Sequence, residues 1–150
     1  MSRQELITAA KAPSEAYGEK DWDAVRNALA PEFVYDEVAT YRKAEGIDEV
    51  IDLWRGWAKA LPDSRATFED PFVDGDTVVL PLTWRGTHTG PLPLPDGEIP
   101  PTGKRIALRS CQVIRIRGGK AISMRQYFDM LTLLSQLGVA PAETAEAAKR

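Results

Sequence analysis

Cysteine and histidine are each represented once in this chain of 150 residues, as Cys111 and His88. A single cysteine excludes a disulfide bond within the chain and any zinc site built from several thiolates. A single histidine excludes metal sites with two imidazole ligands, including the H-E-x-x-H motif of metalloproteases. Because the acidic residues also show no clustered spacing, the sequence predicts no bound metal ion.

A strong excess of one charge is lacking as well, since 19 basic and 22 acidic residues give a formal net charge of −3. The basic residues are scattered and are not interleaved with aromatic side chains, which argues against a nucleic-acid-binding surface. No apolar stretch approaches the length of a membrane span, and the first residues lack the apolar segment of a signal peptide. We therefore expect a cytoplasmic protein that binds neither nucleic acid nor membranes.

Chain length and hydrophobic content predict a single domain over residues 1–150. The chain has the length of one domain, and its 43% hydrophobic content is sufficient for an ordinary packed core. The first third has helical periodicity, with a kink or restart expected at Pro13 and a helix N-cap at Asp21. A strand is expected from Phe33. The clearest helix is predicted over residues 48–61, where apolar side chains recur every three or four residues before Pro62.

From Arg65 onward the hydrophobic period changes to two, which is typical of strands. Strands are predicted at 77–87, 105–117 and 121–128, with a turn at 74–76 before the first and a turn at 118–119 between the last two. Helices are predicted at 131–137 and from Pro141, and the fold class is therefore α+β. A strongly curved antiparallel sheet wrapped around the helices would leave a cone-shaped cavity for a ligand. The loop at 88–102 is rich in proline, and we expect it to lie across the surface or over the opening.

The last predicted strand carries the main candidate for chemistry. Its alternation places Arg125, Tyr127 and Asp129 on one face, and Met124, Gln126 and Phe128 on the other. Desolvation of Asp129 beside apolar residues would raise its pKa and suit it to acid–base catalysis. The alternative is that Asp129 caps the helix that follows. Arg125 and Tyr127 would orient the carboxylate or stabilise its charge. The alternative is a structural ion pair for Arg125 and a core position for Tyr127.

Other candidates also have two interpretations. His88 would either act as a proton shuttle or form a hydrogen bond to the loop backbone. Gln112 interrupts an apolar run. Its buried amide would form a hydrogen bond to a ligand carbonyl or to a group on a neighbouring strand. The remaining candidates would line the cavity or its mouth, with an ordinary core role as the alternative for the tryptophans: Trp54, Trp57, Trp84, Glu37 and Tyr41.

Three segments together carry a family resemblance. They are Thr83-Trp84-Arg85-Gly86-Thr87-His88-Thr89-Gly90, Ile99-Pro100-Pro101-Thr102-Gly103-Lys104-Arg105, and Tyr127-Phe128-Asp129 followed by Leu134, Gln136, Leu137 and Gly138. In this order they closely resemble the SnoaL-like polyketide cyclase family of the nuclear transport factor 2-like superfamily, over residues 5–139. The resemblance implies a cone-shaped α+β barrel, no cofactor and a homodimer.

The resemblance also implies a role for particular residues. Asp129 would be the acid–base residue of a cyclase or isomerase that acts on a polyketide-like, apolar carbonyl compound in secondary metabolism, such as antibiotic biosynthesis. Gln112, Tyr127 and Arg125 would stabilise the developing oxyanion. The chain departs from the family at Glu37, where many members have histidine.

Two alternatives remain open. The string Arg125 to Asp129 is similar to the limonene-epoxide hydrolase branch of the superfamily, in which two carboxylates are bridged by an arginine. The strand 77–87 lacks the second carboxylate, although Glu37 or Glu98 is a possible substitute. The other alternative is a non-catalytic binding or dimerisation domain, a role that the superfamily also contains.

Overall fold

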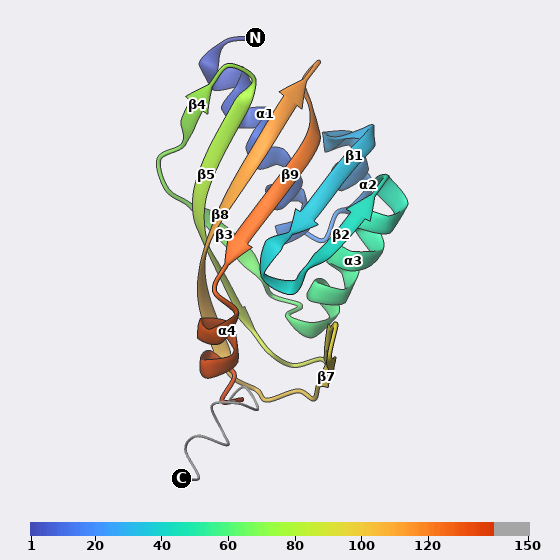
Figure 1. Cartoon of the computed structure of the whole chain (residues 1–150), viewed down its shortest axis with the longest axis vertical. Helices are drawn as coiled ribbons and strands as arrows, with labels where there is room; N and C mark the ends of the chain where they lie inside the picture. Colours follow the sequence, from blue (N-terminus) through green and yellow to red (C-terminus); the bar gives the residue numbers. More distant parts are fainter. Residues whose placement is uncertain (140–150) are drawn as a thin grey trace.

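The computed structural model describes residues 1–139, so the helix expected from Pro141 lies outside the described residues. Within this range the chain forms α helices around one face of a curved sheet (Figure 1). The helices are α1 (Arg3–Gly18), α2 (Trp22–Ala28), α3 (Ile47–Ala60) and α4 (Met130–Gln136), with a 3₁₀ turn η1 (Val38–Thr40). No helix in this range is long and apolar enough to cross a membrane.

Helix α1 runs through Pro13 without restarting, so the expected restart is not observed. A capping box between Ser2 and Glu5 starts the helix and satisfies backbone N–H groups at its first turn. Ile7, Pro13 and Tyr17 lie on its buried face. Packing of this face against the sheet offsets the hydrogen bond that proline cannot make.

The main sheet has the order β2-β1-β9-β8-β5-β3, with β4 also paired to β5. Its strands are β1 (Leu29–Glu37), β2 (Arg42–Glu45), β3 (Arg65–Phe68), β4 (Phe72–Asp74), β5 (Thr77–Thr87), β8 (Arg105–Arg117) and β9 (Lys120–Phe128). The first strand begins four residues before Phe33, where it was expected. A wholly antiparallel sheet was also expected, but β1 pairs with β9 in parallel (Figure 1). This pair joins the first strand of the chain to the last.

The proline-rich loop contains a short hairpin of β6 (Leu92–Leu94) and β7 (Gly97–Ile99), which the sequence did not predict. Leu92 is buried in a second apolar cluster with Leu133 and Leu137, which ties the hairpin to the region of α4. The loop also docks on the end of α3, where the N–H groups of Thr89 and Gly90 both donate to Ala60 O at 3.1 Å.

The two faces of the main sheet have different surroundings. Helix α1 lies behind the sheet in Figure 1, and on the face towards the viewer the only helix drawn is α4, at the lower end of β8. The main core lies on the helical side, where Phe33 and Tyr35 of β1 pack edge-to-face against Trp54 of α3. The cavity lies on this same side, and we call the other surface the outer face.

Candidate active site

A cavity opens between the helices and the inner face of the sheet. It encloses about 60 Å³ of free space, enough for a few water molecules. Its walls are mainly aromatic and aliphatic: Tyr17, Tyr35, Trp54, Trp57, Trp84, Phe128, Leu61, Ile106, Leu108 and Met124. Polar side chains line the remainder: Ser64, Gln112 and Gln126. The half-buried rings of Trp57 and Phe128 meet edge-to-face at 5.9 Å in this wall.

Gln126 is held by hydrogen bonds to both the oxygen and the nitrogen of its side-chain amide. Its Oε1 accepts hydrogen bonds from Trp84 Nε1 at 2.8 Å and Gln112 Nε2 at 3.0 Å. An indole N–H can only donate, so this contact fixes the orientation of the amide. Gln126 Nε2 donates to Tyr35 OH at 2.7 Å. Gln126 Nε2 has no second acceptor among residues 1–139, and Gln126 lines the cavity.

Gln112 lines the cavity as expected, but its amide hydrogens are already used. Its Nε2 donates to Gln126 Oε1 and, over 3.0 Å, to Ser14 Oγ on α1. Only 1% of Gln112 is exposed. The structure therefore gives Gln112 the role of holding Gln126, rather than that of a free donor to the ligand.

Glu37 lies behind the cavity wall and is fully buried. Its Oε2 accepts from Tyr35 OH and from Trp57 Nε1, each at 2.8 Å. Its Oε1 accepts from Thr40 Oγ1 at 2.6 Å and from Arg42 Nη2 at 2.7 Å. Both carboxylate oxygens are occupied, so Glu37 positions Tyr35 and Trp57 and does not face the ligand itself. Burial and the neighbouring Glu37 raise the pKa of Tyr35 well above its usual value.

Tyr17 and Ser64 form a second polar group on the cavity wall, separate from the Gln126 network. Tyr17 OH and Ser64 Oγ lie 2.7 Å apart, and Lys20 Nζ donates to Ser64 O at 2.8 Å. Burial raises the pKa of Tyr17 to about 12. Burial, together with the positive charge of Arg65, lowers the pKa of Lys20 to about 8.

Asp129 does not line this cavity. It is the N-cap of α4, where its carboxylate accepts from Leu131 N at 3.1 Å and from Thr132 Oγ1 at 2.6 Å. The capping interpretation is therefore confirmed. The expected desolvation is wrong, because Asp129 is exposed and the hydrogen bond from Thr132 lowers its pKa.

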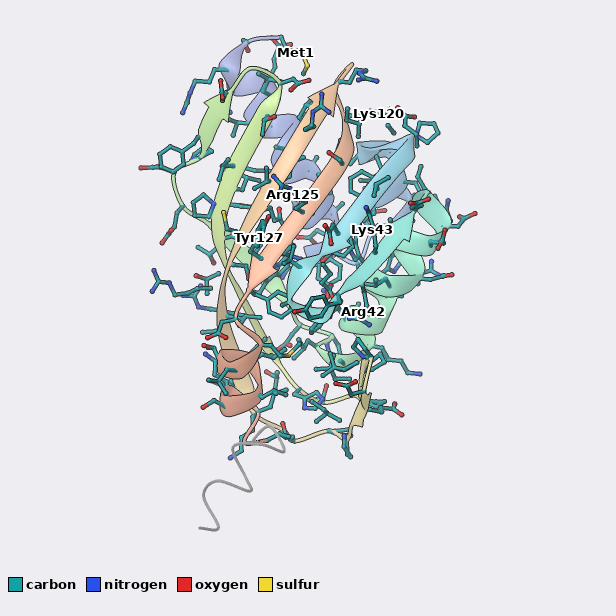
Figure 2. All side chains as sticks on the ribbon, in the orientation of Figure 1. Met1, Arg42, Lys43, Lys120, Arg125 and Tyr127 are labelled. Carbon is teal, nitrogen blue, oxygen red and sulfur yellow. The ribbon has the colours of Figure 1, made fainter. Side chains whose placement is uncertain are left out.

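Arg125 and Tyr127 lie on the outer face, as Figure 2 shows by their position on the side of β9 turned away from α1. Arg125 Nη1 donates to Tyr127 OH at 3.2 Å, so the two form a surface pair. The predicted alternation of β9 is confirmed, but the face with Gln126 points into the cavity. The expectation that Arg125 and Tyr127 stabilise an oxyanion there is therefore wrong.

His88 and Tyr41 are also remote from the cavity. His88 is fully buried, and its Nδ1 accepts from the N–H of Thr102 at 3.2 Å, which ties together the two ends of the proline-rich loop. Burial lowers the pKa of His88. Tyr41 is 95% exposed in the turn before β2. Among residues 1–139, no group of three or more His, Cys, Asp or Glu side chains is placed to hold a metal ion.

The three tryptophans singled out from the sequence, Trp54, Trp57 and Trp84, all line the cavity. Sequence reasoning missed the groups that come from distant parts of the chain. Tyr35 contacts Gln126 across 91 residues, and Ser14 contacts Gln112 across 98. No local pattern reports such pairs. The signal that was present for Gln126 is a polar residue at an inward position of a strand that is otherwise apolar on that face.

The fold and cavity define a class of protein. The structure is similar to that of a hypothetical protein with a ketosteroid isomerase-like fold from Catenulispora acidiphila DSM 44928, with a TM-score of 0.75, 18% identity, and coverage of 90% of this chain and 95% of that one. It is also similar to a proposed SnoaL-like polyketide cyclase from Jannaschia sp. CCS1, with a TM-score of 0.80, 22% identity, and coverage of 94% and 98%. At these identities the similarity shows the fold, which is the expected nuclear transport factor 2-like cone.

The family follows from the sequence match. The model of the SnoaL-like polyketide cyclase family matches residues 7–137, and the chain belongs to this family. IdmH, a proposed polyketide cyclase from Streptomyces antibioticus, is 25% identical, with a TM-score of 0.75 and coverage of 89% of this chain and 99% of that one. No curated protein matches the chain.

Proposed function

We propose that this protein is a cofactor-independent cyclase or isomerase that folds an apolar, carbonyl-bearing molecule inside the aromatic cavity. The family membership supports a cyclase role in general terms. The observation that carries the finer proposal is the amide of Gln126, which three neighbours hold and whose Nε2 has no second acceptor among residues 1–139. A fixed donor in an apolar cavity stabilises negative charge that develops on a carbonyl oxygen.

The shape of the site supports ring closure. Indole and phenol rings restrict a flexible chain to compact conformations, and holding reacting carbons close together lowers the entropic part of the barrier. The substrate class we propose is therefore a short polyketide-like chain or a similar apolar ketone. We further propose that the protein works as a homodimer, which sedimentation velocity would test directly.

The test compares a cavity variant with an outer-face variant. Wild type, Gln126→Leu and Asp129→Asn would be incubated with β-polyketone chains and with epoxides in ¹⁸O-labelled water. We expect a ring-closed isomer of unchanged mass, or the same ring after loss of water, from wild type and Asp129→Asn. Gln126→Leu should lose this product while keeping its circular dichroism spectrum. Loss of the product in Asp129→Asn alone would contradict the proposal and would indicate that Asp129 is the acid–base residue.

Epoxide hydrolysis has less support from the geometry. That reaction needs two carboxylates near one water molecule, and no Asp or Glu among residues 1–139 lines the cavity. Glu37 is fully occupied by its donors, and Arg125 lies on the outer face. Incorporation of ¹⁸O at an epoxide carbon in the same experiment would favour the hydrolase instead.

A non-catalytic binding protein is the second candidate, and one observation favours it. The carboxylate that the family resemblance made catalytic, Asp129, is engaged in capping α4. Under this candidate the cavity would bind a ligand and release it unchanged. Binding of ketones without any conversion by wild type, across the whole panel, would support it over the cyclase.

A further inference from the structure

A row of three side chains leads from the protein surface to the cavity near the end of α1. Lys20 Nζ donates to the backbone oxygen of Ser64 at 2.8 Å and to its Oγ at 3.4 Å. Ser64 Oγ lies 2.7 Å from Tyr17 OH. Tyr17 and Ser64 line the cavity, whereas Lys20 is only partly buried. The row therefore connects a cation that solvent can reach with two hydroxyl-bearing side chains that line the cavity.

We infer that Lys20, Ser64 and Tyr17 form a proton relay that stabilises negative charge on a ligand oxygen, such as that of an enolate. The inference rests on the proposed function, because it assigns a second charge-stabilising group to the same cavity. Tyr17 O–H donates its proton to the ligand oxygen, Ser64 O–H replaces the proton on Tyr17, and Lys20 replaces the proton on Ser64. Solvent then returns the proton to Lys20, so no co-reactant is needed. Tyr17 touches the ligand, and the other two residues act through it.

The electrostatics agree with this direction of transfer. The pKa of Tyr17 is raised to about 12 and that of Lys20 is lowered to about 8. A tyrosinate formed at the cavity wall is therefore a stronger base than the Lys20 amine, and movement of a proton from Lys20 to Tyr17 is downhill. The charged groups around Lys20 are Glu19, Asp63 and Arg65, of which Arg65 lowers its pKa and the two carboxylates raise it.

The backbone at Lys20 is a second, independent observation. Lys20 follows the C-cap of α1 with φ of 56°, and the N–H groups of Lys20 and Asp21 donate to Tyr17 O and Ala16 O. This is a Schellman motif, in which glycine normally occupies the left-handed position because other residues are strained there. A lysine at this position aims its amine back over the Tyr17 ring, 4.2 Å from the centroid. A lysine at this strained position is explained if its amine is required for the relay to Ser64 and Tyr17.

The test compares two small ligands that differ by one oxygen. 2,4-Dinitrophenolate stays ionised over the pH range of interest and mimics an enolate oxygen, and 1,3-dinitrobenzene is the same ring without that oxygen. Dissociation constants of both would be measured by quenching of tryptophan fluorescence from pH 6.5 to 9.5. The ratio of the two constants reports stabilisation of the oxyanion, because effects on the cavity itself affect both ligands.

The expected result is a ratio that favours the phenolate in wild type below about pH 8 and declines as Lys20 loses its proton. Tyr17→Phe should reduce this preference about tenfold or more at pH 7, the effect of losing one hydrogen bond to a charged group. Lys20→Met should reduce it roughly three- to tenfold and remove the pH step. Ser64→Ala should also weaken it and flatten the profile.

Controls separate the relay from simple changes of fold. Lys11→Met removes another lysine of α1, whose amine lies over the ring of Phe68 rather than at the cavity, and should leave the ratio unchanged. Lys20→Gly removes the amine and the backbone strain together, and should behave like Lys20→Met. A full preference and pH step in Ser64→Ala would overturn the relay, as would a pH step that persists without Lys20. If neither ligand binds to wild type, the proposed function fails, and the relay fails with it.

Discussion

The indole nitrogen of Trp57 donates to Glu37 Oε2 at 2.8 Å, so one wall of the cavity is fastened to a carboxylate that solvent does not reach. Tyr35 donates to the same oxygen, and Arg42 and Thr40 donate to the other. The stability of the fold and the shape of the cavity therefore depend on one buried group.

The first prediction concerns replacement of this carboxylate by Glu37→Gln. Donors approach both carboxylate oxygens, so the NH₂ group of glutamine would face a donor in either orientation and leave Arg42 without a counter-charge. Removing one member of a buried ion pair typically costs about 3–5 kcal/mol. We expect the free energy of unfolding in urea to fall by about 3 kcal/mol.

The control is an ion pair of the same length on the surface. Arg26 Nη2 and Asp48 Oδ1 also lie 2.7 Å apart, but the two side chains are 48% and 85% exposed. Asp48→Asn should change the free energy of unfolding by no more than about 1 kcal/mol. Equal decreases in the free energy of unfolding of the two variants would contradict the prediction, because they would show that burial does not increase the contribution of the Glu37 ion pair to stability.

The second prediction concerns the docking of the proline-rich loop. A Cβ atom at Gly90 would collide with the backbone oxygen of Lys59. Because backbone cannot move aside as a side chain can, Gly90→Ala should destabilise the protein by about 1–3 kcal/mol. Gly56→Ala, in the middle of α3, meets only Pro93 Cγ at 3.4 Å and should be neutral or stabilising by up to about 1 kcal/mol. Thermal unfolding of both variants would measure this, and a larger loss in Gly56→Ala would contradict it.

The third prediction concerns pH. Burial lowers the pKa of His88 in the folded state, so the unfolded chain takes up a proton at a higher pH than the folded protein does. The free energy of unfolding should therefore decrease as the pH falls through about 6.5, with a slope of at most about 1.4 kcal/mol per pH unit. Because His88 is the only histidine, His88→Asn should remove this slope between pH 7 and 5.5. The interpretation would fail if the slope remained.

The fourth prediction concerns Asp129. Asparagine caps helices as well as aspartate does, so Asp129→Asn should keep the helix α4 and the affinity of the cavity for apolar ligands. Asp129→Ala should lose part of the stability, because Leu131 N and Thr132 Oγ1 lose their acceptor. Equilibrium unfolding and ligand titration of the two variants would test this, and weaker ligand binding in Asp129→Asn alone would contradict it.

Much of the fold could be predicted because its signals are local. The turn at Gly118-Gly119, the strand 105–117 and the helix over 48–61 were placed within about one residue of their observed bounds. Alternation in β9 also separated its two faces correctly. The pattern could not decide which face is internal, since Phe128 lies on one face and Tyr127 on the other.

The interior of the site could not be predicted for a different reason. The orientation of the Gln126 amide is set by its hydrogen bonds to Tyr35 and Trp84, which lie on β1 and β5. These contacts depend on the order of strands in the sheet, and in particular on the parallel pairing of β1 with β9. A resemblance that pointed to Asp129 identified the family correctly, but it did not show which side of the strand end the carboxylate occupies.

The parallel pairing of β1 with β9 has a consequence for how the chain acquires its structure. Strand β1 is complete at residue 37, but its partner in the sheet is not complete until residue 128. During synthesis, β1 must therefore remain without this neighbour until almost the whole described chain has emerged. Contacts of such sequence separation also form slowly in refolding. Tyr35 and Gln126, one on each strand, can meet only at that late stage. A shortened chain that ends before β9 would lack the strand that joins β1 to β8 and the cavity-lining side chains that this strand carries.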